Sequence, residues 1–148
     1  MARLIDLFVV SCPWSVACCS CDGCGMAKSS FSQLQVYQLA EKLSDEIWAV
    51  VLTWDRFARD TVGNQIVRSA DSIGANIAEG AGRGSFQDNK RFVKIARGSL
   101  NETQHWLRRA YQRKLLNDEQ IKKLQPIVAE LAPRLNAYLR SIGPVNEE

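Results

Sequence analysis

Apolar residues recur along four segments of the chain at the spacing of amphipathic helices. In the first segment, predicted from Ser32 to Trp54, the spacings alternate between four and three residues, which keeps the apolar positions on one side of a helix. These positions are Val36, Ala40, Leu43, Ile47, Val50 and Trp54. The second segment is centred on residues 68–84, and Ile66, Ala70, Ile73 and Ile77 form its narrow seam among small residues. Residues 55–62 break the pattern, which predicts a connection there.

The third and fourth segments are longer and have equally regular seams. The third helix is predicted from Phe86 to Gln112, with a core side made of Phe92, Ile95, Ala96, Ser99, Thr103, Trp106, Leu107 and Ala110. The fourth follows Asn117 and ends at Gly143, with a seam of Ile121, Leu124, Val128, Leu131, Leu135, Tyr138 and Ile142. Pro126 and Pro133 fall opposite that seam, so one helix bent around the core is expected, with two shorter helices as the alternative.

Local signals mark where the helices begin and end. Gly80 is predicted to take the left-handed conformation that stops the second helix. Ser85 followed by Asp88 matches the capping box that opens the third helix, and Asn117 followed by Gln120 matches the one that opens the fourth. The links between helices are therefore short. Together these features predict an all-α fold, an antiparallel up-and-down four-helix bundle over residues 31–143, with a leader at 1–30 and a tail at 144–148.

Composition agrees with one folded domain. The chain has 148 residues, of which 46% are hydrophobic and 24% are charged, the balance of a globular protein. No apolar run approaches the roughly 20 residues that cross a bilayer, so no membrane partner is expected.

All five cysteines lie in the predicted leader, at positions 12, 18, 19, 21 and 24. Their overlapping Cys-x-x-Cys spacing resembles an iron–sulfur run, but the fourth ligand of such a run is missing, and a zinc site needs a longer loop between its pairs. We therefore expect no metal and no cofactor. A signal peptide is the alternative use of the apolar run at residues 4–10, yet Asp6 interrupts it. We expect residues 1–25 to be disordered or an over-extended start, with Met26 as the natural beginning.

Positive charge is concentrated in the third helix and its flanks. Between residues 83 and 114, nine basic and two acidic residues give a charge of +7 in a chain whose net charge is +3. A stripe made of Lys90, Lys94, Arg97, Asn101, Gln104 and Arg108 lies on one side of the helix, and Arg83, Arg91 and Arg109 flank it. Such a stripe predicts an RNA or other nucleic-acid ligand bound mainly through phosphates. The alternative is a protein–protein scaffold whose basic face is only solvated.

The first helix has a second apolar strip besides its core side. It consists of Tyr37, Trp48, Val51 and Leu52. A helix that is apolar on two sides is usually buried twice, once in its own domain and once elsewhere, so these residues predict a subunit interface.

Catalytic patterns are missing from the sequence. His105 is the only histidine, and no cysteine or carboxylate stands beside it to form a nucleophile–base pair. Gly80, Gly82 and Gly84 follow a helix rather than a strand and lack the lysine of a phosphate-binding loop. We therefore expect a protein that is not an enzyme.

Two motifs resemble a known family. They are Gln65-Ile66-x-Arg68-Ser69-Ala70-x-Ser72-Ile73-x-x-Asn76-Ile77-Ala78-Glu79-Gly80-x-Gly82-Arg83 and Arg91-Phe92-x-x-Ile95-Ala96-x-Gly98-Ser99-Leu100-Asn101-Glu102-Thr103. Over residues 31–143 the chain resembles the four-helix-bundle family named after proteins encoded in 23S rRNA intervening sequences. The resemblance implies a cytoplasmic bacterial homo-oligomer, a ring of five subunits. It also implies a distant similarity to the accessory proteins of diversity-generating retroelements, with a reverse transcriptase as partner.

Overall fold

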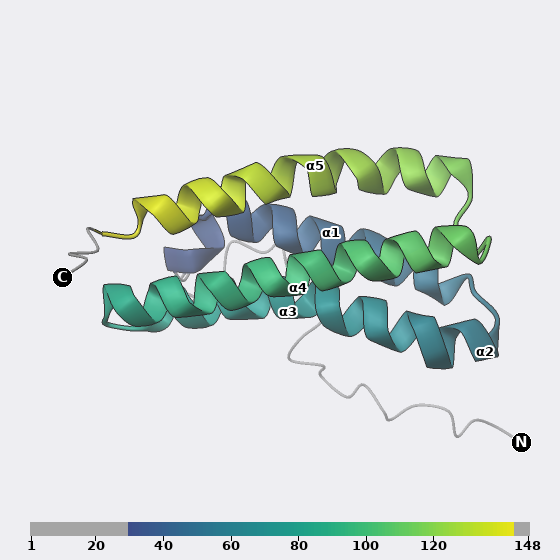
Figure 1. Cartoon of the computed structure of the whole chain (residues 1–148), viewed down its shortest axis with the longest axis horizontal. Coiled ribbons are helices and arrows are strands. Elements are labelled where there is room, and N and C mark those ends of the chain that lie inside the picture. The colour runs from purple at the N-terminus through teal and green to yellow at the C-terminus, as the bar shows by residue number, and fades with distance from the viewer. Residues whose placement is uncertain (1–29, 144–148) are drawn as a thin grey trace, which may run out of the picture.

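The computed structural model describes residues 30–143, which form an all-α bundle of four long helices and so confirm the predicted fold class (Figure 1). The elements are a 3-10 turn η2 (Ser30–Gln33), α1 (Gln35–Leu52), a short α2 (Arg56–Ala58), a π-helical turn η3 (Arg59–Gly63), α3 (Asn64–Gly82), α4 (Phe86–Gln112) and α5 (Asp118–Ser141). The predictions for the cysteine cluster, the leader and the tail lie outside the described residues. No helix within residues 30–143 is long and apolar enough to cross a bilayer.

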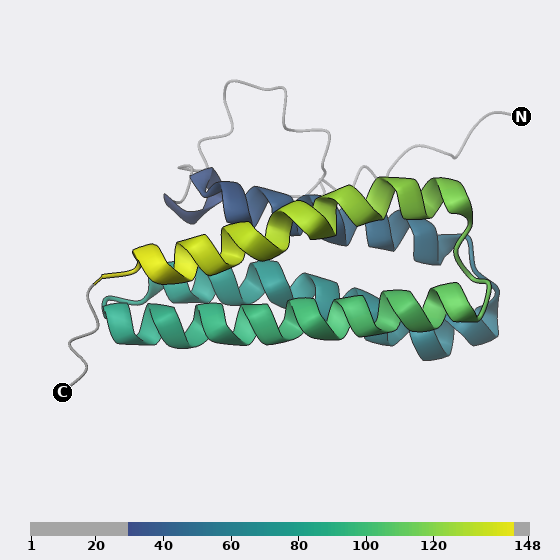
Figure 2. The same cartoon turned by 45° about the horizontal axis from the view of Figure 1, so that its top comes forward.

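Each long helix packs against two others. α1 contacts α3 and α5, and α4 contacts the same two helices. Figure 2 shows α1 lying beside α5, and α3 beside α4, with successive long helices running in opposite directions. The bundle therefore has an α1–α3 side and, across the core from it, an α4–α5 side.

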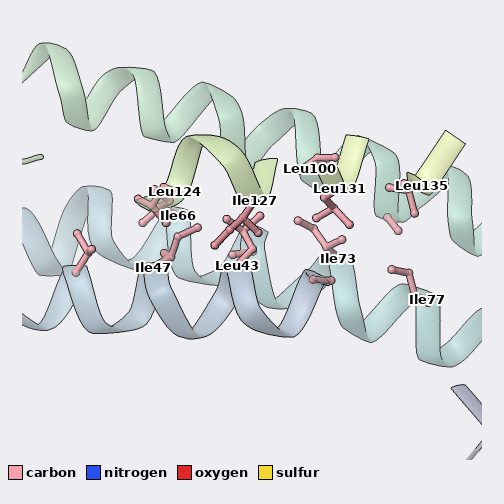
Figure 3. Close-up of a cluster of buried hydrophobic side chains, with 14 of the residues drawn as sticks. Leu43, Ile47, Ile66, Ile73, Ile77, Leu100, Leu124, Ile127, Leu131 and Leu135 are labelled. Atoms are coloured by element: carbon pink, nitrogen blue, oxygen red, sulfur yellow. The ribbon is translucent and has the colours of Figure 1, made fainter. Parts of the chain in front are cut away.

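The predicted seams meet in one hydrophobic core (Figure 3). The largest apolar side chains of that core have at most 2% of their surface exposed, namely Leu43, Ile47, Ile66, Ile73, Ile77, Leu100, Leu131 and Leu135. Burial of each such side chain is worth about 1.5–3 kcal/mol, so these contacts between helices dominate the stability of the fold. The helical periodicity of the sequence predicted an inward position for all of these residues except Leu100.

The inward side of α4 is rotated slightly from the predicted one. Val93 and Leu100 are buried, although neither was expected on the core side. Ile95, which was expected there, is 44% exposed, and Phe92 is half-buried. The difference arises because α4 packs against both α3 and α5, so its buried side points between these two helices.

The segment predicted as a connection before α3 is helical, and that prediction was wrong. The side chain of Asp55 caps the segment by accepting a hydrogen bond from the Ala58 N–H at 3.0 Å. Ala58, Val62 and Ile66 are all buried, although a spacing of four residues drifts by about 40° per step around an α-helix. The π-helical turn η3 absorbs this drift because its turns hold more residues. Apolar positions therefore stay inward through an interval that breaks the α-helical period.

Gly80 does not stop α3, which is a further correction to the predicted elements. It is buried inside the helix, and α3 continues to Gly82. A Cβ atom on Gly80 would lie 2.8 Å from Asn89 Oδ1 and 3.0 Å from Phe92 Cβ. Gly80 is therefore a point of close approach between α3 and α4. Left-handed residues occur instead after α4, where Lys114 has a φ of 60°, and after α5, where Gly143 has a φ of 52°.

Hydroxyl groups line the contact between α3 and α4. Ser69 and Thr103 are buried with their hydroxyl oxygens 3.1 Å apart, and the hydroxyl oxygens of Ser72 and Ser99 lie 3.0 Å apart. Asn76 is half-buried and donates hydrogen bonds to Ser72 on its own helix, at 2.7 Å to the carbonyl and 3.0 Å to the hydroxyl. The small side chains of α3 thus allow close packing while their polar groups keep partners.

Replacing Thr103 by valine tests this contact. The change preserves side-chain volume but removes the hydroxyl beside Ser69, so we expect the free energy of unfolding to fall by about 1 kcal/mol. Ser69→Ala added to Thr103→Val should recover part of the loss, because no buried hydroxyl then faces a methyl group. Urea unfolding of the two single variants and the double variant measures this coupling. Strictly additive losses would show that the two hydroxyls do not interact.

α5 is a single helix with both prolines on its exposed side, as predicted. Asn117 and Gln120 form the predicted capping box, with reciprocal hydrogen bonds of 2.8 and 3.0 Å. The seam of α5 differs from the prediction in one respect. Ile127 is buried in the core, whereas Ile121 and Val128 are only half-buried and face a groove beside α4.

Candidate nucleic-acid interface

The orientation of α4 decides which of its basic side chains are available to a ligand. Its inward side is fixed by Val93, Ala96, Leu100, Thr103 and Ala110, which are all buried. At about 100° per residue, the predicted stripe is turned some 60° from the outward direction of α4. It leans toward α5, because Gln104 and Arg108 line the groove between the two helices. The stripe therefore lies on a flank of α4 and not at the centre of its exposed side.

Lys90 is the member of the stripe that the structure removes from the free surface. It is half-buried, and its Nζ donates a hydrogen bond to the carbonyl oxygen of Gly143 at 2.9 Å. A lysine at this position is well placed electrostatically, because the carbonyl end of α5 carries a partial negative charge. Lys90 thus joins the start of α4 to the end of α5, and its contact with nucleic acid stays a prediction.

Arg83 has partners of its own beside the turn between α3 and α4. It forms an ion pair with Glu79 one helical turn earlier. Its guanidinium carbon also lies 5.2 Å from the ring centroid of Phe92, within cation–π range. Roughly half of the Arg83 side chain is still exposed, but part of its charge is balanced locally. Arg83 therefore belongs to the edge of the candidate surface.

The cations that remain exposed on α4 are Arg91, Lys94, Arg97 and Arg108. Within residues 30–143, no carboxylate lies in ion-pair distance of any of these four side chains. Asn101 is exposed between Arg97 and Arg108, while Arg109 is half-buried and donates a hydrogen bond to Gln112 at 3.0 Å. The part of the predicted surface with the most available charge is thus the first half of α4, at Arg91, Lys94 and Arg97. We call these three residues the α4 cation set.

The groove between α4 and α5 was not predicted from the sequence. Its volume is about 640 Å³, and it lies toward the connection between the two helices. The lining residues are Gln104, Leu107, Arg108, Tyr111, Leu116, Asp118, Ile121, Lys122, Leu124, Gln125, Val128, Ala129 and Ala132. A sequence signal was present, because Leu107 and Tyr111 place apolar groups one turn apart on the flank of α4.

The predicted interface strip of α1 is only partly exposed. Trp48 and Leu52 have 55% and 53% of their surface exposed, respectively. Val51 is buried in the chain's own core, and a Cβ atom on Gly63 would lie only 2.8 Å from its Cγ1. Val51 is therefore unavailable to a second subunit, because the π-helical turn η3 covers it.

Tyr37 occupies the other end of the same strip. It is half-buried, and its ring meets that of Phe31 edge-on with 4.9 Å between centroids. Burial raises the pKa of Tyr37 to about 12, helped by its hydrogen bond to Glu41 and by the charge of that carboxylate. The Tyr37 hydroxyl therefore holds its proton more tightly than an exposed tyrosine does, and it lies beside an acidic side chain of α1.

Within the described part of the chain, no three metal-ligating side chains gather. His105 is exposed, and its ring stands edge-on to that of Trp106 with 5.2 Å between centroids. These side chains form no recognisable catalytic group.

Residues 32–137 match the family model described as "23S rRNA-intervening sequence protein". A crystal structure from Bacteroides thetaiotaomicron VPI-5482, of a protein with unknown function from the S23 ribosomal protein family, is similar to this chain. The two share 24% sequence identity with a TM-score of 0.63, over 72% of this chain and 99% of that one. At this identity the similarity supports the bundle fold alone. None of the curated proteins matches the sequence.

Proposed function

Since this chain belongs to the 23S rRNA-intervening sequence protein family, we propose that it is a non-enzymatic, oligomeric protein that binds RNA or other nucleic acid. The α4 cation set is the surface that would contact the phosphates. Its members are exposed on one helix with no carboxylate in ion-pair distance within residues 30–143. This availability of charge is the observation that carries the proposal. Cations without protein partners are well suited to phosphates, whose counterions they displace.

Two further aspects of the role follow only from the family resemblance. One is assembly into a homo-oligomer, with five subunits as the predicted number. The other is an accessory role beside a reverse transcriptase in the cytoplasm. Both remain predictions about this chain, and neither is needed for the α4 cation set to bind a phosphate backbone.

A protein–protein scaffold is the second candidate, and the α4–α5 groove favours it. A contiguous apolar groove is typical of a binding surface for another molecule. The two candidates are compatible, because the α4 cation set lies outside the lining of the groove.

A salt titration tests nucleic-acid binding. We expect labelled structured RNA to bind the full-length protein at about 50 mM salt and to lose about 20- to 40-fold in affinity at about 200 mM, the dependence expected for three phosphate contacts. Fluorescence anisotropy measures both affinities. Duplex DNA and single-stranded RNA, titrated in parallel, identify the preferred ligand. Affinity that does not change with salt, or no binding at low salt, would contradict phosphate recognition by α4.

A further inference from the structure

An exposed apolar ridge on α1 has no partner within the described part of the chain. Trp48 and Leu52 lie one helical turn apart and are each more than half exposed. Glu41 and Asp45 are also exposed, and all four positions fall within about 60° around the helix axis. We call these four residues the α1 ridge. It combines two bulky apolar groups with two negative charges.

The α4–α5 groove has the complementary character. Its interior is lined mainly by aliphatic side chains, including Leu107 and Val128, while Tyr111 is 58% exposed. Arg108 and Lys122 are exposed cations in its lining, against one carboxylate, Asp118. The groove therefore offers apolar contact together with a net positive charge.

The ridge and the groove lie on different sides of the same subunit. Glu41 and Asp45 border a furrow of about 250 Å³ between α1 and α3, which places the ridge on the α1–α3 side. The groove lies between α4 and α5. These two helices lie across the core from the α1–α3 side (Figure 2). One subunit therefore cannot fill its own groove with its own α1 ridge.

We propose that the α1 ridge of one subunit docks into the α4–α5 groove of a second copy of this chain. Trp48 and Leu52 enter the groove as apolar anchors at positions i and i+4, the usual arrangement when a helix binds a groove. Glu41 and Asp45 then face Arg108 and Lys122. Charge complementarity selects a second copy as the occupant. The ridge carries two negative charges, whereas in the groove lining the two cations outnumber the one carboxylate.

This contact joins two different surfaces, so it is heterologous. Each subunit keeps a free ridge at one side and a free groove at the other, and the contact repeats until a ring closes or a chain of subunits grows. The inference rests on the homo-oligomer part of the proposed function and supplies the missing half of its interface. It also assigns Arg108 to the contact between subunits, which leaves the α4 cation set to nucleic acid.

Two defective variants of the full-length protein test the contact. Trp48→Glu with Leu52→Glu disables the ridge, and Arg108→Glu with Tyr111→Glu disables the groove. All four side chains are exposed, so circular dichroism should show unchanged helix content. Light scattering should give a wild-type mass more than twice the 16.6 kDa of one chain, and a monomer for each variant. Phe57→Glu, which changes an exposed aromatic residue outside both surfaces, should keep the wild-type mass.

An equimolar mixture of the two defective variants decides the geometry. The ridge-defective chain keeps its groove and the groove-defective chain keeps its ridge, so the mixture should form a one-to-one heterodimer and nothing larger. A groove-defective variant that dimerises by itself would show that ridges pack on ridges, which overturns the proposal. A monomeric wild-type protein, or a mixture that stays monomeric, also overturns it. These measurements are made without nucleic acid. A result that overturns the docking of ridge into groove therefore says nothing against RNA binding, which the salt titration tests separately.

Discussion

Replacing Gly80 by alanine is expected to lower the free energy of unfolding by about 1–2 kcal/mol, and replacing it by valine by about 3 kcal/mol or more. The added Cβ atom would meet Asn89 Oδ1 at 2.8 Å, Phe92 Cβ at 3.0 Å and the Asn89 backbone oxygen at 3.2 Å. Because one of these neighbours is backbone, α3 and α4 must separate to admit the methyl group. Alanine recovers about 1 kcal/mol through its better helix propensity. Valine recovers less and adds two more methyl groups to the same close contact, so its loss is larger.

Gly98→Ala is the matched control for Gly80→Ala. Gly98 lies in the middle of α4, it is exposed, and a Cβ atom there would meet no atom within 4 Å. We expect this change to raise the free energy of unfolding by about 0.5–1 kcal/mol, since only the backbone entropy of glycine is removed. Urea unfolding of both variants measures the difference. Equal and positive effects at the two positions would show that the contact between α3 and α4 at Gly80 does not require glycine.

Reversing the charge of Lys94 and Arg97 together is expected to weaken RNA binding about 100-fold at low salt, because two attractive interactions with phosphates become repulsive. The slope of affinity against salt should also become shallower, by about one unit for each phosphate that is no longer neutralised. Both side chains are exposed and neither lines the α4–α5 groove, so the fold and the mass of the oligomer should not change. Anisotropy titrations at two salt concentrations, with light scattering on the same samples, separate these effects.

The control must carry the same change in net charge at a different place. Lys42→Glu with Arg59→Glu satisfies this, because Lys42 is exposed on α1 and Arg59 is exposed on η3. A loss of affinity confined to the α4 variant supports a defined surface. Equal losses in both variants would show that only the total charge of the protein attracts RNA, and the α4 cation set would then have no special role.

The course of α4 was predictable from the sequence, but the environment of its charges was not. Helical period placed Ala96, Thr103 and Ala110 correctly on the core side. The helical periodicity of the sequence could not show on which side of α4 the helix α5 packs. The hydrogen bond from Lys90 to Gly143 joins residues 53 positions apart, and the same packing turns Arg108 toward the groove.

Four features could be read from the amino-acid sequence alone: the long helices, most of their inward positions, the N-terminal caps at Ser85 and Asn117, and the resemblance to the family. These features depend on residues within a few positions of one another, and that is the range over which helical period and capping act. Three other features emerge from the packing of the helices: the close contact at Gly80, the burial of Val51, and the set of α4 cations that have no carboxylate beside them within residues 30–143. Each of these depends on the neighbour that a helix meets across the bundle, which no pattern within a single helix specifies.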